Sequence, residues 1–189
     1  MRSWIYSVAT TAVLAATPTS AEFVSSDTSD VDLYLTGGTG GHVVHGKSDK
    51  LVVSESAGVV TVAAYLDCTV EDGRHTSCIQ TGIALRDAQI WKYLESGTFQ
   101  KAVFSVERNR LVMPGGEQVA ADAVGTLALH GIERQLSFHY VATRAGNDIQ
   151  VNGRIMISLN DFNIERPSFF GVHTGIVAQI KVWFTLQAS

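Results

Sequence analysis

Histidines are the side chains of this sequence best suited to acid–base or metal chemistry. The chain has six of them: His42, His45, His75, His130, His139 and His173. His42 and His45 are three positions apart, which on a strand places them on opposite faces. The sequence contains no HExxH or GxSxG motif and no paired metal ligands. Local spacing therefore indicates no catalytic or metal centre, and leaves open only a constellation assembled from distant residues.

Two cysteines could carry redox or metal chemistry. Cys68 and Cys78 flank a polar loop, with nine residues between them. In an exported chain such a pair is expected to form a disulfide, and the short loop limits its stabilising effect to roughly 2–3 kcal/mol. Two free thiols are the alternative. A metal site is disfavoured because neither CxxC spacing nor clustered histidines accompany the pair.

The first 21 residues have the pattern of a signal peptide. Arg2 gives a positive end, an apolar run of about a dozen residues follows, and small residues lead up to Ala21. The run is too short for a spanning helix, although a membrane anchor or a core helix is the alternative reading. We expect cleavage near Ala21 and a bacterial protein that is periplasmic or secreted.

The chain expected after cleavage is acidic. Residues 1–21 contain one of the 14 basic residues and none of the 18 acidic ones, so the rest has 13 basic residues and a net charge near −5. This charge disfavours nucleic acid and anionic lipid surfaces as partners. Residues 22–32 are rich in Ser and Asp, and we expect a flexible N-terminal segment there.

Short runs that alternate apolar and polar residues dominate residues 33–189. The clearest is a hairpin in which His130-Gly131 forms the turn between two alternating strands. The exception is residues 84–94, where spacings of three predict a helix. About eight strands with short connections and one short helix predict an all-β domain, an antiparallel eight-stranded barrel that leaves no exposed edges.

Four local patterns occur in order between residues 55 and 186: the hairpin Gly125–Arg134 (GTLALHGIER), Arg86-Asp87 with the helix and strand that follow, the corner Asn160–Ile164, and the terminal strand Val177–Leu186. Together they resemble the YceI-like family of exported bacterial proteins with lipocalin-like barrels. The hairpin is the most specific, because it is similar to the family's G-x-L-T-L-H-G-V-T-R. Gln89 stands where the family commonly has His, and Asn163 where it has Gly, which is typical of a divergent member.

The resemblance implies a binding protein that holds a long apolar amphiphile, such as a polyisoprenoid or fatty-acid derivative, inside its barrel. Transport, storage or envelope stress response would be its role, with no enzyme activity and no cofactor, and a homodimer is compatible with the sequence. The residues expected to line the cavity are Leu127, Leu129, Phe138, Tyr140, Ile155, Ile157, Phe162, Trp91 and Leu94. From the residues alone a solid core is the alternative, because apolar stripes usually fill cores.

Three polar residues that match the family pattern are expected near the mouth of the barrel, where they would orient a headgroup. They are Arg86, Asp87 and His130. The alternatives are an ion pair at the start of the helix for the first two, and a turn histidine bonded to backbone for the third. The corresponding alternative function is an envelope scaffold or interaction protein with a solid barrel core and no stored ligand. A lipid isomerase or cyclase would need a polar cluster inside the barrel.

Overall fold

The computed structural model describes residues 23–38, 43–48, 51–66, 70–71, 74–75, 79–169 and 172–188. The expected signal peptide, residues 1–21, lies outside this range, and so do Cys68, Cys78 and His42. The expected cleavage and disulfide therefore stay predictions.

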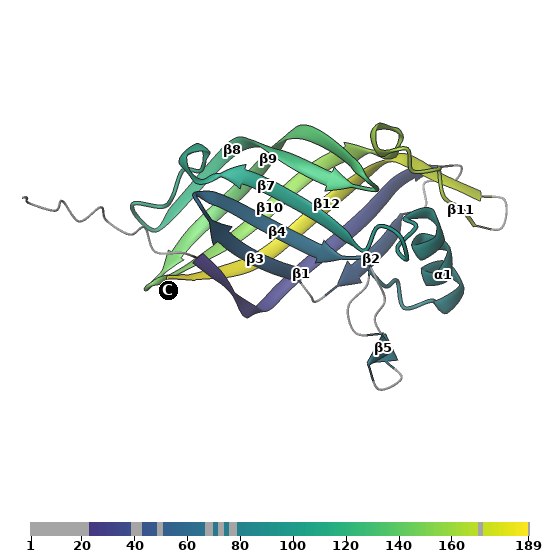
Figure 1. Cartoon of the computed structure of the whole chain (residues 1–189), viewed down its shortest axis with the longest axis horizontal. Coiled ribbons are helices and arrows are strands. Elements are labelled where there is room, and N and C mark those ends of the chain that lie inside the picture. The colour runs from purple at the N-terminus through teal and green to yellow at the C-terminus, as the bar shows by residue number, and fades with distance from the viewer. Residues whose placement is uncertain are drawn as a thin grey trace, which may run out of the picture.

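Eight antiparallel strands form a closed ring (Figure 1). In chain order they are β1 (Phe23–Gly38), β3 (Leu51–Ser56), β4 (Val59–Tyr65), β7 (Lys101–Glu107), β8 (Gln118–Leu129), β9 (Ile132–Ala145), β10 (Asp148–Ser158) and β12 (Val172–Ala188). Each strand pairs with the next one in this order, and β12 closes the ring by pairing with β1. The expected all-β barrel is thereby confirmed.

Shorter strands add to this ring. β2 (Val44–Ser48) pairs with residues 31–35 of β1. On the same side of β1, the pairing with β3 is limited to Val24 and Ser54. Counting β2, nine strands form the wall, one more than expected. Two-residue β11 (Ser168–Phe169) extends the sheet beside β12, while β5 (Val70–Glu71) and β6 (Arg74–His75) form a separate ribbon.

The expectation of a flexible segment over residues 22–32 is wrong for residues 23–32. These residues form the first part of β1 and pair with β12 over most of that length. Pairing with β12, which is distant in sequence, decides that these polar residues form a strand.

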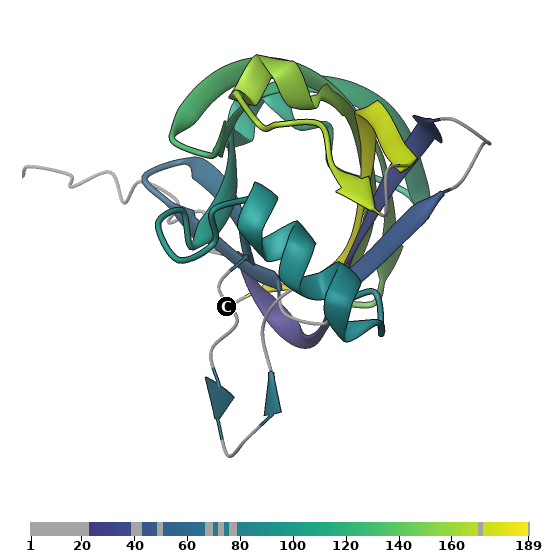
Figure 2. The same ribbon diagram turned by 90° about the vertical axis from the view of Figure 1, so that its right-hand side faces the viewer.

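The single α-helix among the described residues, α1 (Ala84–Tyr93), lies across one end of the barrel (Figure 2). Its position agrees with the helix expected over residues 84–94. The buried face differs from the simple spacing of three, because Ile90 and Leu94 are buried whereas Leu85 is 70% exposed. The described residues also form two 3₁₀ turns, η1 (Arg108–Arg110) after β7 and η2 (Leu159–Phe162) after β10.

The turn between β8 and β9 has the geometry that its two residues predict. Leu129 and Ile132 are paired, and both His130 (φ 52°) and Gly131 (φ 72°) have positive φ. Positive φ at both central residues is the mark of a type I′ turn, whose twist matches that of the flanking strands. Histidine tolerates this region better than most residues, so the turn fixes the register of the whole hairpin.

Buried apolar residues form two clusters inside the ring. The helix-end cluster lies beneath α1 and contains Leu35, Val44, Leu66, Ile79, Ile90, Leu94, Leu127, Leu129, Ile157, Leu159, Phe162, Ile164 and Ala178. The other, the barrel cluster, contains Val31, Leu51, Val53, Val60, Ala64, Val106, Ala123, Tyr140, Ala142, Ile149, Phe184 and Leu186. The first fills its end of the barrel, whereas the second surrounds a cavity.

Candidate binding cavity inside the barrel

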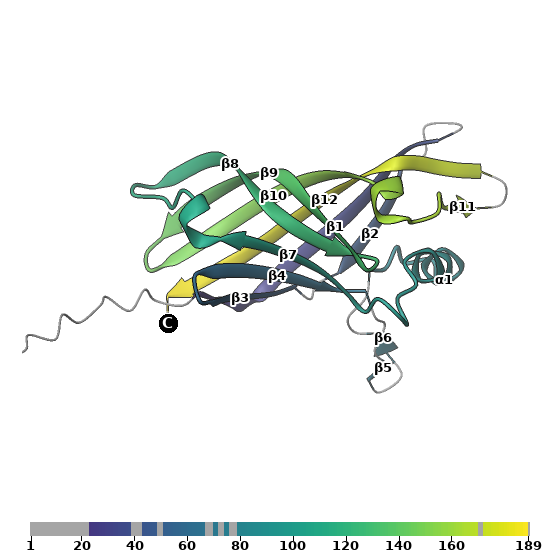
Figure 3. The ribbon, with the colours of Figure 1, turned by 45° about the horizontal axis from the view of Figure 1, so that its top comes forward.

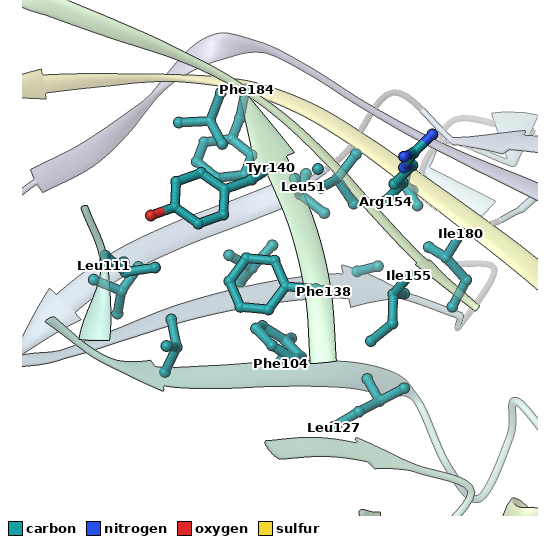
Figure 4. A pocket seen from close by; sticks show the side chains of 18 of the residues that line it. Leu51, Phe104, Leu111, Leu127, Phe138, Tyr140, Arg154, Ile155, Ile180 and Phe184 are labelled. Atoms are coloured by element: carbon teal, nitrogen blue, oxygen red, sulfur yellow. The ribbon is translucent and has the colours of Figure 1, made fainter. Parts of the chain in front are cut away.

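An apolar cavity lies inside the barrel (Figure 4). The volume of the cavity that the centres of water-sized spheres can reach is about 130 Å³. At roughly 10–15 Å³ of such space per water, this corresponds to on the order of ten waters or an apolar chain of similar bulk. The residues that line it are Val31, Leu51, Val60, Val62, Ala64, Ala102, Phe104, Val106, Leu111, Met113, Leu127, Phe138, Tyr140, Ala142, Val151, Gly153, Arg154, Ile155, Ile180, Val182, Phe184 and Leu186.

An aromatic wall forms one side of the cavity. The rings of Phe104 and Phe138 meet edge to face with their centroids 4.8 Å apart, and Phe138 lies 5.4 Å from the stacked ring of Tyr140. Phe104 occupies the space that a side chain at Gly125 would need, so this glycine lets the far end of the ring approach the backbone of β8 closely. The glycine thus positions the first ring of the wall.

The connection between β7 and β8 lies at the end of the barrel away from α1 (Figure 3). Leu111 and Met113 of this connection line the cavity. The backbone N–H of Val112 donates to the Tyr140 hydroxyl (2.7 Å), which donates in turn to the Val112 carbonyl (3.1 Å). Because both bonds involve the same backbone residue, the Tyr140 hydroxyl holds the connection in place and its single O–H donor is used within the protein.

A second anchor holds this connection further along. The guanidinium of Arg144 donates twice to the Pro114 carbonyl, at 3.2 Å each, and the Arg144 backbone N–H donates to the carbonyl of Glu117. Two ordered contacts from β9 therefore fix residues 111–117 over the end of the barrel, although they are not part of any strand or helix until residue 118.

Four of the nine residues expected to line the cavity do so: Leu127, Phe138, Tyr140 and Ile155. The other five lie outside it. Leu129, Ile157, Phe162 and Leu94 belong to the helix-end cluster, and Trp91 packs against that cluster while its indole N–H donates to the Ile79 carbonyl. The physical reason is that the inward faces of the strands continue past the cavity to a region where α1 and η2 fill the barrel.

The three residues expected at the mouth do not line the cavity. The Asp87 carboxylate is buried and accepts hydrogen bonds from the backbone N–H and the hydroxyl of Thr81, both at 2.6 Å. It therefore fixes the chain that enters α1. Arg86 is half-buried on the same helix.

His130 also has a structural role. Its Nδ1–H donates to the carbonyl of Phe162 at 2.9 Å, and its ring lies 4.6 Å from that of Phe99. The Glu95 carboxylate is 3.6 Å from Nε2. These contacts tie the β8–β9 turn to η2, which agrees with the alternative of a turn histidine bonded to backbone.

Most of the lining was not singled out by the sequence. Residues such as Leu51, Val62, Ile180 and Phe184 occupy inward positions of alternating strands, and that alternation was the available signal. Leu111 and Met113 had no such signal, because they lie in a connection without regular structure.

Metal and membrane features are limited in the described part of the chain. No group of three or more His, Cys, Asp or Glu side chains is arranged to hold a metal ion there. Within the same residues, no helix combines the length and the apolar character needed to cross a membrane.

Two solved structures share this fold. A polyisoprenoid-binding domain from Saccharophagus degradans, implicated in plant cell wall breakdown, is 17% identical, with a TM-score of 0.70 over 89% of this chain and 99% of that chain. BcnA from Burkholderia cenocepacia is 14% identical, with a TM-score of 0.60 over 83% of this chain and 95% of that chain. At these identities the likeness concerns the fold alone.

Comparison with curated proteins gives no match. The family model of the YceI-like domain matches residues 24–188, which is nearly all of the barrel described above and begins within its first strand. The chain therefore belongs to the YceI-like family.

Proposed function

We propose that this protein binds a long apolar amphiphile, a polyisoprenoid or fatty-acid derivative, inside its barrel. The observation that carries the proposal is the cavity itself, which is enclosed by eight strands and lined almost wholly by aliphatic and aromatic side chains. The structural relative from Saccharophagus degradans is described as polyisoprenoid-binding, which supports the same ligand class.

The cavity favours a flexible hydrocarbon chain over a compact polar molecule. The Tyr140 hydroxyl is engaged by Val112, and the other lining side chains are apolar except that of exposed Arg154. Each buried CH₂ group contributes roughly 0.8 kcal/mol, so ten of them contribute about 8 kcal/mol before the costs of association and chain ordering. A gain of this size supports useful affinity without any polar contact inside the barrel.

Binding is favoured over catalysis by the same lining. A lipid isomerase or cyclase would need a positioned acid or base at the reacting atoms. The polar side chains of the described cavity wall are Tyr140, whose hydroxyl is bonded to backbone, and exposed Arg154, whose guanidinium stays protonated and is therefore a poor acid or base. The proposal is therefore a carrier or store for a lipid.

Export completes the proposal. The leader-like residues 1–21 and the pair Cys68 and Cys78 fit a protein that acts in the periplasm or outside the cell, in transport, storage or envelope stress response. Mass spectrometry of the protein from an envelope fraction is expected to give a chain that begins at Glu22. A thiol assay on the same material is expected to find no reactive cysteine; two reactive thiols would contradict the disulfide.

One observation favours a second candidate function. The helix-end cluster is densely buried, with Phe162 and Ala178 at 0% exposure. If the rest of the interior were equally full in solution, the protein would be an envelope scaffold or interaction protein without a stored ligand.

Native mass spectrometry before and after organic extraction separates the two candidates. We expect an adduct that extraction removes, and we expect the extracted protein to take up 1-dodecanol. Phe138→Arg should abolish both, because it places a charge in the aromatic wall, whereas Ser137→Arg on the exposed face of the same strand should not. A wild-type protein that carries no adduct and takes up no 1-dodecanol would refute lipid binding.

A further inference from the structure

A polar groove opens on the outside of the barrel where β7 and β8 separate. Pairing between these strands is limited to three residue pairs, from Val103–Ala128 to Ser105–Thr126. Beyond Ser105 the strands diverge toward their connection, and the groove lies in the gap. Its space for the centres of water-sized spheres is about 160 Å³, so it can hold a small polar group.

The groove adjoins the apolar cavity through a thin wall. Val106 lines both spaces. Gly125 lines the groove with no side chain of its own, and the Phe104 ring, which lines the cavity, lies directly against it. Two side chains therefore separate the apolar interior from the polar exterior at this place.

Ordered parts of the chain occupy both ends of the barrel. Beneath α1 the helix-end cluster is packed, with Leu129 and Ile157 at 5% and 4% exposure. At the other end, Tyr140 and Arg144 fix the connection between β7 and β8 by hydrogen bonds to its backbone. Because Val106 lines both spaces, the gap between β7 and β8 is a place where an apolar tail in the cavity can be joined to a polar head outside it.

The lining of the groove fits an uncharged head better than an anionic one. The hydroxyls of Ser105 and Thr126 and the amide of Gln135 both donate and accept hydrogen bonds. Arg110 is the guanidinium of the groove, but it already pairs with Glu107, with N–O distances of 3.2 and 3.4 Å. The Glu107 carboxylate would repel an anion brought to this pair, whereas a hydroxyl group can both donate to it and accept from the guanidinium.

We propose that the β7–β8 groove is the head site of the barrel: the tail of the ligand lies in the cavity, and an uncharged, hydroxyl-bearing head emerges past Phe104 and Val106 into the groove. This inference rests on the proposed lipid binding and names the part of the ligand that the cavity does not hold. It also assigns Glu107 a role in specificity, namely the exclusion of carboxylate heads.

Two probes with equal tails test the head site, 1-dodecanol and dodecanoate, each titrated calorimetrically into extracted protein. The wild-type protein is expected to bind the alcohol more tightly. Glu107→Gln removes the repelling charge and releases Arg110, so it should strengthen dodecanoate binding about five-fold and change dodecanol binding by less than two-fold.

Glu133→Gln is the matched control. Glu133 is an exposed carboxylate on β9 outside the groove, so its substitution changes the net charge equally. An equal effect of both substitutions on dodecanoate, or tighter binding of dodecanoate than of dodecanol by the wild type, would overturn the head site while leaving lipid binding intact. Failure of the wild type to bind either probe would instead refute the proposed function, and the head site with it.

Discussion

Filling the cavity from its own wall tests whether the barrel is hollow. Ala64 on β4 lines the cavity and Ala178 on β12 lies in the helix-end cluster, and both are small and buried, at 9% and 0% exposure. Ala64→Leu adds three carbon atoms on the side that faces the cavity, whereas Ala178→Leu adds the same atoms to a packed region. The two substitutions are therefore chemically identical and differ only in what surrounds them.

The expected changes in stability have opposite signs. At about 0.8 kcal/mol per buried carbon, Ala64→Leu gains at most about 2.4 kcal/mol, and the side-chain entropy of Leu removes roughly 0.5–1 of that. We expect the free energy of unfolding of extracted protein to rise by up to about 1.5 kcal/mol. Overpacking by Ala178→Leu should lower it by about 1–3 kcal/mol.

Ala64→Leu should also weaken ligand binding. If the added side chain displaces three methylene groups of the ligand, Ala64→Leu costs about 2.4 kcal/mol of binding, or roughly a 50-fold loss of affinity for 1-dodecanol. Urea denaturation of extracted protein measures the stability change, and calorimetric titration measures the affinity. Equal destabilisation by both substitutions, with 1-dodecanol affinity unchanged in Ala64→Leu, would show that the interior at Ala64 is already full.

Three further outcomes follow from single contacts. Tyr140→Phe removes both hydrogen bonds to Val112, so we expect a loss of about 1–2 kcal/mol in urea denaturation and faster hydrogen exchange of the β7–β8 connection. Gly125→Ala places a Cβ against a phenyl ring and 2.7 Å from a backbone carbonyl oxygen, so it should destabilise by about 1–3 kcal/mol, and unchanged stability would contradict the tight approach. The pKa of the Tyr34 phenol is raised, first by desolvation and then by the charge and hydrogen bond of Asp32. A raised pKa means that the folded state favours the neutral phenol. The stability that Tyr34 contributes is therefore present below the ordinary tyrosine pKa and is lost as the pH rises through the folded-state value. Spectrophotometric titration of the phenol should therefore show a lower pKa in Asp32→Asn.

Periodicity was sufficient for the class of fold. Alternation placed the hairpin with its His130-Gly131 turn, and the turn chemistry fixed its register, because both signals are local. The helix over residues 84–94 was visible for the same reason. The prediction of a flexible segment is wrong for residues 23–32, because they form a polar strand whose composition is like that of a flexible segment. The partner of this strand, β12, is distant in sequence.

Alternation also shows which side chains point inward, but it does not show how far along the barrel each one lies. Leu127 and Leu129 are two residues apart on the same face of β8, and only the first lines the cavity. The difference arises because α1 and η2, which are distant in sequence, fill the space around Leu129. Likewise Asp87 and His130 are polar residues at the barrel end whose partners, Thr81 and the Phe162 carbonyl, are set by the folded chain.

The sequence by itself determined that this chain forms an antiparallel barrel with an apolar interior, because strand alternation and turn residues act over short distances. Only the tertiary structure decided that one end of that interior is solid and the rest is hollow. Whether a set of inward side chains fills a barrel depends on the summed volume contributed by several strands, a helix and a connection such as residues 108–117. No local pattern contains that sum.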